Sequence, residues 1–285
     1  MTTWMERVLR GLLAVMLVGA GALAHTGGSP ISGLLGDAGW AGAAGLDQAA
    51  GYVLYATAAL VLLMPRGRWL ARAVVPAALW LTLVPLARVI AGGDFAALAP
   101  LGQGNRVLGL VALALLTTHR PGAPNAARSV ALLRLGAAAV FLGHGLEALL
   151  QHPQFVDYLL VTARRAAGFP LTEAATHPIL YVIGVVDVVV ALSVWRGPHR
   201  LALGWACFWG FATAAMRLVY YGPLGGAPHA AVRALNGGGE LILLMSLQAG
   251  LHYPTWGPRL RRGRIDAPRH PSFAQDRGGG GDAVP

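Results

Sequence analysis

The sequence predicts an all-α fold, a polytopic membrane protein with eight transmembrane helices arranged as two tandem parallel four-helix repeats. The first observation is composition: 55% of the 285 residues are hydrophobic and only 12% are charged, whereas soluble domains carry about a quarter charged residues. The second is a set of eight apolar stretches near the ~20 residues that cross a bilayer. The third is an internal match between residues 1–125 and residues 126–252.

The predicted spans follow one another with short connections. They lie near residues 7–25, 49–65, 69–91, 105–118, 129–151, 178–195, 200–221 and 236–252. In the first span, Arg7 and Arg10 precede an apolar stretch that ends in small residues, a pattern also typical of a signal peptide. We favour a transmembrane helix, because this segment has an internal counterpart at residues 131–150.

The distribution of arginine predicts that both termini are cytoplasmic, in a bacterial cytoplasmic membrane. Basic residues gather in the cytoplasmic loops of membrane proteins. On that side we expect Arg7, Arg10, Arg66, Arg68, Arg72, Arg120, Arg128, Arg196, Arg200 and the arginines of the C-terminal tail. The opposite loops hold fewer, namely Arg106, Arg164, Arg165 and Arg233.

Two segments are predicted to lie outside the membrane. Residues 153–168 begin at Pro153 and end at Gly168, which fits either an amphipathic helix folded over the bundle or a plain connecting loop. Residues 257–285 are predicted to be a flexible basic tail that is attracted to anionic membrane lipid. The chain thus divides into a degenerate repeat (1–125), a second repeat (126–256) and the tail.

The two repeats match at landmark residues but differ in their ionisable residues. Arg88 aligns with Arg217, Trp80 with Trp209 and Asn105 with Asn236. At four other positions only the second repeat is ionisable: His144 replaces Ala20, Glu147 replaces Leu23, Asp187 replaces Ala58 and Glu240 replaces Gly109. Because a charge inside a bilayer is costly and tends to mark function, we expect any site to lie in the second repeat.

Helix geometry predicts that these side chains converge in the outer half of the second bundle. At ~1.5 Å per residue, Asp187 falls near mid-membrane, and the other ionisable residues fall nearer the outer ends of three further helices. The predicted site residues are His144, Glu147, Asp187, Arg217 and Glu240, with Trp209 as an apolar wall and Asn236 ahead of Glu240. Three carboxylates against one obligate cation, Arg217, predict that one acid is neutral or that a cation is bound.

Two alternatives to a ligand site stay open. In the first, Arg217 pairs with Asp187 or Glu240 and His144 hydrogen-bonds Glu147, so that the cluster only locks the bundle. In the second, His144, Glu147, Asp187 and Glu240 hold a metal. The metal is the weaker alternative, because Arg217 would repel a cation and one histidine with three acids is not a specific metal signature.

Other functions find little support in the sequence. A net charge of +10 could suggest nucleic acid, but the arginines lie between apolar runs, as membrane topology predicts. The single cysteine, Cys207, excludes a disulfide within the chain. Walker, Rossmann, HExxH and GxSxG motifs are absent. Haem is disfavoured, because only His144 lies well inside a predicted span and no CxxCH motif exists.

Two motifs of the second repeat carry a family resemblance. One runs from Leu133-Arg134-Leu135 to Phe141-Leu142-Gly143-His144-Gly145, and the other is Trp209-Gly210-Phe211-Ala212-Thr213 ending in Arg217. They resemble the DoxX-like family of small four-helix membrane proteins, although the duplication and Glu147 depart from its pattern. The resemblance implies an inner-membrane protein, in some relatives tied to quinone-linked sulfur oxidation or redox homeostasis.

Three functions therefore remain as predictions. The first is a redox-linked membrane component whose outward pocket binds a small polar molecule or a quinone headgroup and works with a partner subunit. The second is a proton- or cation-coupled transporter that uses Asp187, and the third is a structural scaffold. The inner halves of the last four spans are predicted to be almost wholly apolar apart from Ser193 and Ser246, which argues against a transport path through the bundle.

Overall fold

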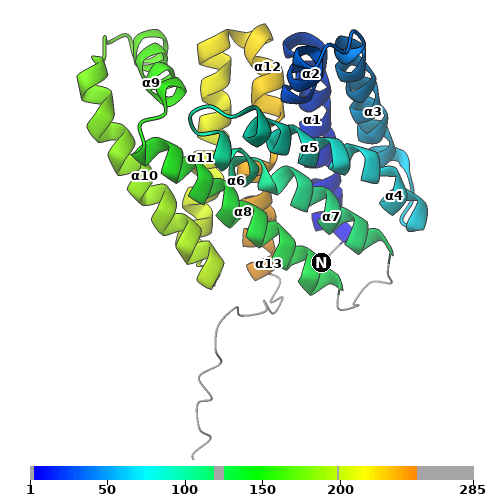
Figure 1. Cartoon of the computed structure of the whole chain (residues 1–285). Helices are drawn as coiled ribbons and strands as arrows, with labels where there is room; N and C mark the ends of the chain where they lie inside the picture. The colour runs from blue at the N-terminus through cyan, green and yellow to red at the C-terminus, as the bar shows by residue number, and fades with distance from the viewer. Residues whose placement is uncertain (1–2, 119–124, 198, 249–285) are drawn as a thin grey trace, which may run out of the picture.

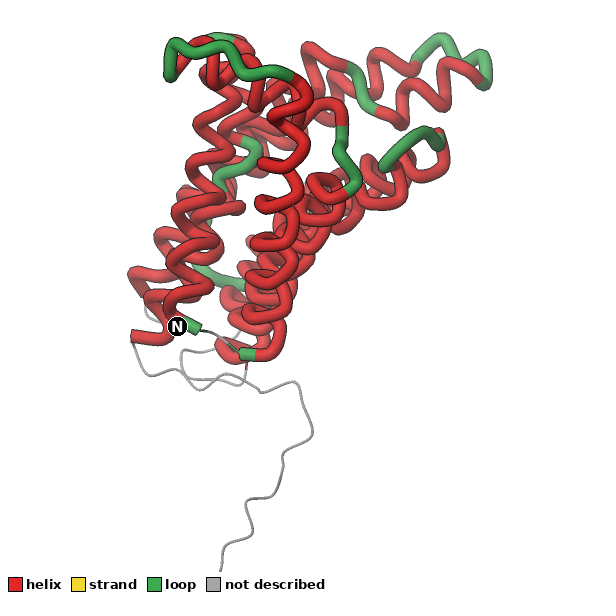
Figure 2. The backbone as a smooth tube through the Cα atoms, turned by 90° about the vertical axis from the view of Figure 1, so that its left-hand side faces the viewer, coloured by secondary structure: helices red, strands yellow, loops and turns green. Residues whose placement is uncertain are grey.

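The computed structural model describes residues 3–118, 125–197 and 199–248, and these residues form helices and no strand (Figures 1 and 2). The predicted all-α class is therefore confirmed for this part of the chain. The first half contains α1 (Thr3–Gly27), α2 (Pro30–Asp37), α3 (Ala43–Leu63), α4 (Arg68–Ala73), α5 (Val75–Ala91), a 3-10 turn (Ala96–Leu98), α6 (Ala99–Gly102) and α7 (Gly104–Thr118). The second half contains α8 (Asn125–Leu149), α9 (Pro153–Ala166), α10 (Glu173–Arg196), α11 (Arg200–Tyr221), α12 (Pro223–Ala231) and α13 (Leu235–Gln248).

Seven helical segments of the described chain are long and apolar enough to cross a membrane, which indicates a multi-pass membrane protein. They are Trp4–Asp37, Ala43–Leu63, Arg68–Ala91, Ala96–Thr118, Asn125–Leu149, Glu173–Arg196 and Arg200–Tyr221. Each coincides with one of the first seven predicted spans. Helix α13 begins the predicted eighth span at Leu235, and the end of that span and the tail at 257–285 lie outside the described residues.

The helices of the two halves share one apolar core. Helix α1 packs on α3 and also on α12 and α13, while α8 packs on α10 and also on α7 and α13 (Figure 1). Fully buried side chains from both halves meet in this core, among them Leu13 and Leu54 from the first half and Leu203 and Ile242 from the second. The site described below therefore rests on helices from both halves.

Helix α11 and helix α13 approach each other closely because glycines face one another between them. A Cβ atom on Gly210 would overlap the backbone of Asn236 and Gly237, and one on Gly237 would come within 2.7 Å of the Cys207 carbonyl oxygen. Small residues allow this kind of approach between membrane helices. The contact places the start of α13 directly against the middle of α11.

Three shorter helices, α2, α9 and α12, lie between the long ones. Helix α9 spans Pro153–Ala166, so the segment is a helix, as the first of the two interpretations predicts. Proline at its first turn and Gly168 at φ 72° after its end supply the start and stop signals. Helices α2 and α12 were not predicted, although α2 has a capping box between Ser29 and Ser32.

Buried arginines anchor the helices at the end that holds the chain's N-terminal residues. Arg10 pairs with Glu6 at 3.0 Å and donates to the carbonyl oxygens of Val61 and Met64. These oxygens have no partner within the helix because they lie at the end of α3. Arg134 of α8 is only 2% exposed and donates to the Trp195 carbonyl oxygen at 3.1 Å. The prediction of an almost wholly apolar inner half is therefore wrong at Arg134, whose guanidinium is accommodated because it reaches the carbonyl groups at the end of α10.

Candidate functional site

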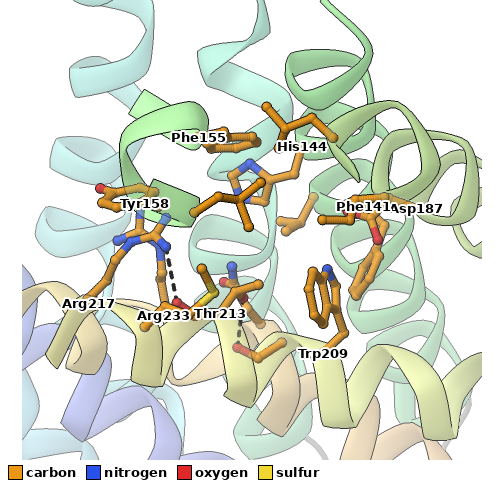
Figure 3. A pocket seen from close by; sticks show the side chains of 16 residues that line it. Phe141, His144, Phe155, Tyr158, Asp187, Trp209, Thr213, Arg217 and Arg233 are labelled. Atoms are coloured by element: carbon orange, nitrogen blue, oxygen red, sulfur yellow. Dashed lines mark hydrogen bonds between the residues drawn. The ribbon is translucent and has the colours of Figure 1, made fainter. Parts of the chain in front are cut away.

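A cavity that opens to the surface lies between α8, α9, α10, α11 and the start of α13 (Figure 3). Five of the seven predicted site residues line it, namely His144, Asp187, Trp209, Arg217 and Asn236. Most of the remaining wall is apolar and comes from Val140, Phe141, Phe155, Leu159, Leu180, Ile183 and Met216, with Tyr158, Gly210, Thr213 and Arg233 completing it. We refer to this cavity as the pocket.

One end of the pocket is cationic. Arg217 is 4% exposed, and its guanidinium lies 3.7 Å from the centre of the Tyr158 ring and donates to the Thr213 carbonyl oxygen at 3.1 Å. Arg233 donates to the His229 carbonyl oxygen at 3.0 Å. The two guanidinium groups lie on the same side of the pocket, next to Tyr158 (Figure 3).

Helix α9 closes this end with aromatic side chains. Burial raises the pKa of Tyr158 to about 12, so its hydroxyl stays protonated at neutral pH and lies 3.3 Å from the Tyr221 hydroxyl. Burial also lowers the pKa of Arg233, with neighbouring Tyr158 and Tyr221 acting in the opposite direction. Phe155 covers His144, with a ring separation of 5.9 Å. Helix α9 thus forms part of the pocket wall.

The other end of the pocket is acidic and lies deeper in α10. Asp187 is 4% exposed and faces the indole N–H of Trp209, while its Oδ1 atom has no hydrogen-bond partner in the described structure. Trp209 is held by stacking on Trp205, with ring centres 5.9 Å apart. Asp187 and Trp209 lie across the pocket from the two arginines (Figure 3).

His144 connects the pocket to the first half of the chain. Its Nδ1 lies 2.8 Å from a Glu147 carboxylate oxygen, so the predicted hydrogen bond between them is confirmed. The ring packs against Gly102 of α6, where a Cβ atom would lie 3.3 Å from His144 Cε1. Glu147 stands behind His144 and does not line the pocket.

Two asparagines at matched positions of the halves meet beside the pocket. Asn105 of α7 donates its amide to Asn236 Oδ1 at 2.9 Å, and both side chains are buried. Glu240, one turn further along α13, is fully buried near Cys207 and does not line the pocket. Neither of its carboxyl oxygens has a hydrogen-bond partner among the described residues.

The charge balance differs from the expected surplus of acids. Of the three predicted carboxylates only Asp187 lines the pocket, because Glu147 is bonded behind His144 and Glu240 lies one turn beyond Asn236 along α13. Arg233 adds a second cation. No ion pair joins Arg217 to Asp187 or Glu240 in the described structure. Of the contacts expected for a purely structural cluster, only the one between His144 and Glu147 is present there.

The weaker metal alternative also lacks its geometry. Within the described residues, no three His, Cys, Asp or Glu side chains are placed to hold one ion together. His144 and Glu147 are adjacent, but no third such side chain of the described structure joins them.

Three residues that line the pocket were not among the predicted site residues, namely Phe155, Tyr158 and Arg233. Arg233 was predicted only as a loop arginine, yet it stands three residues before Asn236, a spacing that puts two residues on one helical face.

Comparisons with known proteins gave no match to a family model, to a curated protein or to a solved structure. The resemblance to the DoxX-like family therefore stays a prediction.

Proposed function

We propose that this chain is a multi-pass protein of a bacterial cytoplasmic membrane whose outward-facing pocket binds a small amphiphilic molecule with a hydrogen-bond-accepting head, such as a quinone headgroup. The observation that carries the proposal is the pocket itself, where an apolar wall meets the donors Arg217 and Arg233 and the His144 ring. Small-molecule sites generally combine an apolar lining with a few placed polar groups.

The proposed topology has eight spans as two tandem parallel four-helix repeats, with both termini cytoplasmic. Two contacts support the repeat: α1 packs on α3 as α8 packs on α10, and the matched residues Asn105 and Asn236 bond each other. Two equivalent residues meet in this way when they lie on a twofold axis that relates the repeats. The resemblance of the second repeat to the DoxX-like family agrees with this topology.

The pocket's chemistry suits an acceptor head and an apolar body. Arg217 is a permanent donor, since guanidinium does not deprotonate in proteins. Nδ1–H of His144 donates to Glu147, so the second ring nitrogen of the neutral ring is an acceptor, which suits a hydroxyl such as that of a reduced quinone. Phe141, Ile183 and Met216 offer the apolar surface for the rest of the molecule. A redox role for a bound quinone would rely on a partner subunit that exchanges its electrons.

The test is native mass spectrometry of the protein in a mild neutral detergent, before and after addition of decylubiquinone, decanoate or decanol. Ile183→Phe should fill the pocket, while Ile179→Phe, on the same helix but 39% exposed, is the matched control. We expect one retained molecule in the wild type and in Ile179→Phe and its loss in Ile183→Phe. A wild type that retains none and takes up none of the three compounds overturns the proposal.

A further inference from the structure

We propose that the pocket selects amphiphiles whose head carries a negative charge, with the head held between Arg217 and Arg233. This inference rests on the proposed function and narrows it, because a neutral quinone head would also accept hydrogen bonds. The class of ligand is a carboxylate or phosphate head on an apolar tail. Three observations support it.

The first observation is that Arg217 is buried and has no anionic partner. Its guanidinium contacts the Tyr158 ring and the Thr213 carbonyl oxygen, and its Nε atom has no hydrogen-bond partner in the described structure. A buried charge is costly unless it is paired. A guanidinium cannot relieve this cost by losing its proton, so the geometry favours an anion as the missing partner.

The second observation is a local surplus of positive charge. Arg233 is close enough to influence both Arg217 and Arg106, and the Nε atom of Arg106 also lacks a partner. Glu147 is the carboxylate of the described residues that acts on Arg217 and Arg233, and it already bonds His144. The three arginines therefore outnumber the acids near them, and one bound anion would reduce the imbalance.

The third observation is the polarity of the pocket from end to end. The arginines and Tyr158 form one end, and Asp187 with Trp209 forms the other (Figure 3). Among the lining residues, none at the far end is a cation that could hold a second negative charge, and apolar side chains line the space between. The arrangement thus fits a molecule with one anionic head and an apolar body.

The first experiment compares ligands that share a tail and differ only in the charge of the head. Wild-type protein in phosphatidylcholine nanodiscs is titrated with decanoate, decanol and decylamine, and binding is measured against empty nanodiscs. Because a charge-assisted contact is about twice as strong as a neutral one, we expect decanoate to bind at least about tenfold more tightly than decanol. Equal binding of decanoate and decanol overturns the charge selection but leaves the proposed pocket standing, whereas no binding of any compound removes both.

The second experiment assigns the selectivity to its residues. Arg217→Gln and Arg233→Gln should each weaken decanoate binding about tenfold and leave decanol binding unchanged. Arg217→Lys should keep the preference for decanoate because it keeps the charge. Arg88→Gln is the matched control, since Arg88 aligns with Arg217 but is exposed. The assignment is overturned if Arg217→Gln and Arg233→Gln bind decanoate as tightly as Arg88→Gln does.

The anionic head could belong to a membrane lipid or to a free amphiphile. Repeating the decanoate titration in phosphatidylglycerol nanodiscs distinguishes these sources. If the lipid headgroup competes for the arginines, the wild type binds decanoate more weakly in phosphatidylglycerol than in phosphatidylcholine. Arg217→Gln then binds decanoate equally in the two lipids. Unchanged binding assigns the pocket to a free amphiphile, and either result supports an anion site.

Discussion

The contact between α11 and α13 at Gly210 predicts a large effect from adding a single methyl group. In Gly210→Ala, the new Cβ would lie 2.6 Å from the Gly237 backbone nitrogen, about 0.8 Å short of the 3.4 Å at which ordinary contacts begin. The backbone of α13 cannot rotate away as a side chain could, so the helices must separate. Overpacking of this kind costs ~1–3 kcal/mol.

The matched control for this prediction lies on the same helix. Gly204 has no atom within 4 Å of its Cβ position, so Gly204→Ala adds the same methyl group without a clash. Both variants gain up to ~1 kcal/mol of helix propensity, and the difference between their unfolding free energies therefore isolates the packing cost. Reversible unfolding in mixed micelles, followed by circular dichroism, measures this difference.

We expect Gly210→Ala to be less stable than Gly204→Ala by ~1–3 kcal/mol. Because Gly210 also lines the pocket, Gly210→Ala should bind decanoate more weakly than Gly204→Ala does. Equal stability of the two variants would show that α11 and α13 are not in close backbone contact, and the placement of Asn236 beside the pocket would then be wrong.

Three further perturbations have clear expected outcomes. Tyr158→Leu should lower stability by ~0.5–2 kcal/mol in thermal or chemical unfolding, because it removes the ring beneath Arg217, whereas Tyr158→Phe should lose little. Glu6→Gln should destabilise the fold by ~1–3 kcal/mol, because both of its arginine partners lose a charged acceptor; an unchanged unfolding midpoint would contradict this. Burial lowers the pKa of His152 below its ordinary 6.5, so the unfolded chain takes up this proton first and the unfolding midpoint should fall as pH drops below 6.5. His152→Gln should reduce that fall, and an identical pH profile in this variant would refute the role of His152.

The spans and most of the pocket could be predicted because they depend on local pattern. Apolar runs of membrane length fix where the long helices lie, and counting residues from the helix ends places His144, Asp187 and Arg217 in the outer half of the second bundle. Five of the predicted site residues accordingly line one cavity. The prediction for Pro153–Ala166 was also local, since proline and glycine mark its two ends.

Which side chains reach the pocket could not be predicted so well. Glu240 is one turn from Asn236 and shares its face of α13, yet that turn carries it past the pocket wall to a fully buried position near Cys207. Arg134 was overlooked in an inner half described as apolar, although its guanidinium reaches the Trp195 carbonyl oxygen. These outcomes depend on which helix packs against which, and a single sequence carries little information about such contacts.

The contacts of Gly102 with His144 and of Asn105 with Asn236 have a consequence for how this protein can be dissected. The half that carries most pocket residues leans on α6 and α7 of the other half, so residues 126–248 alone would expose a face that those helices cover. We therefore expect residues 126–248 to need the first half of the chain in order to fold and to keep the pocket intact. Recovery of function from fragments would require that both be made in the same cell.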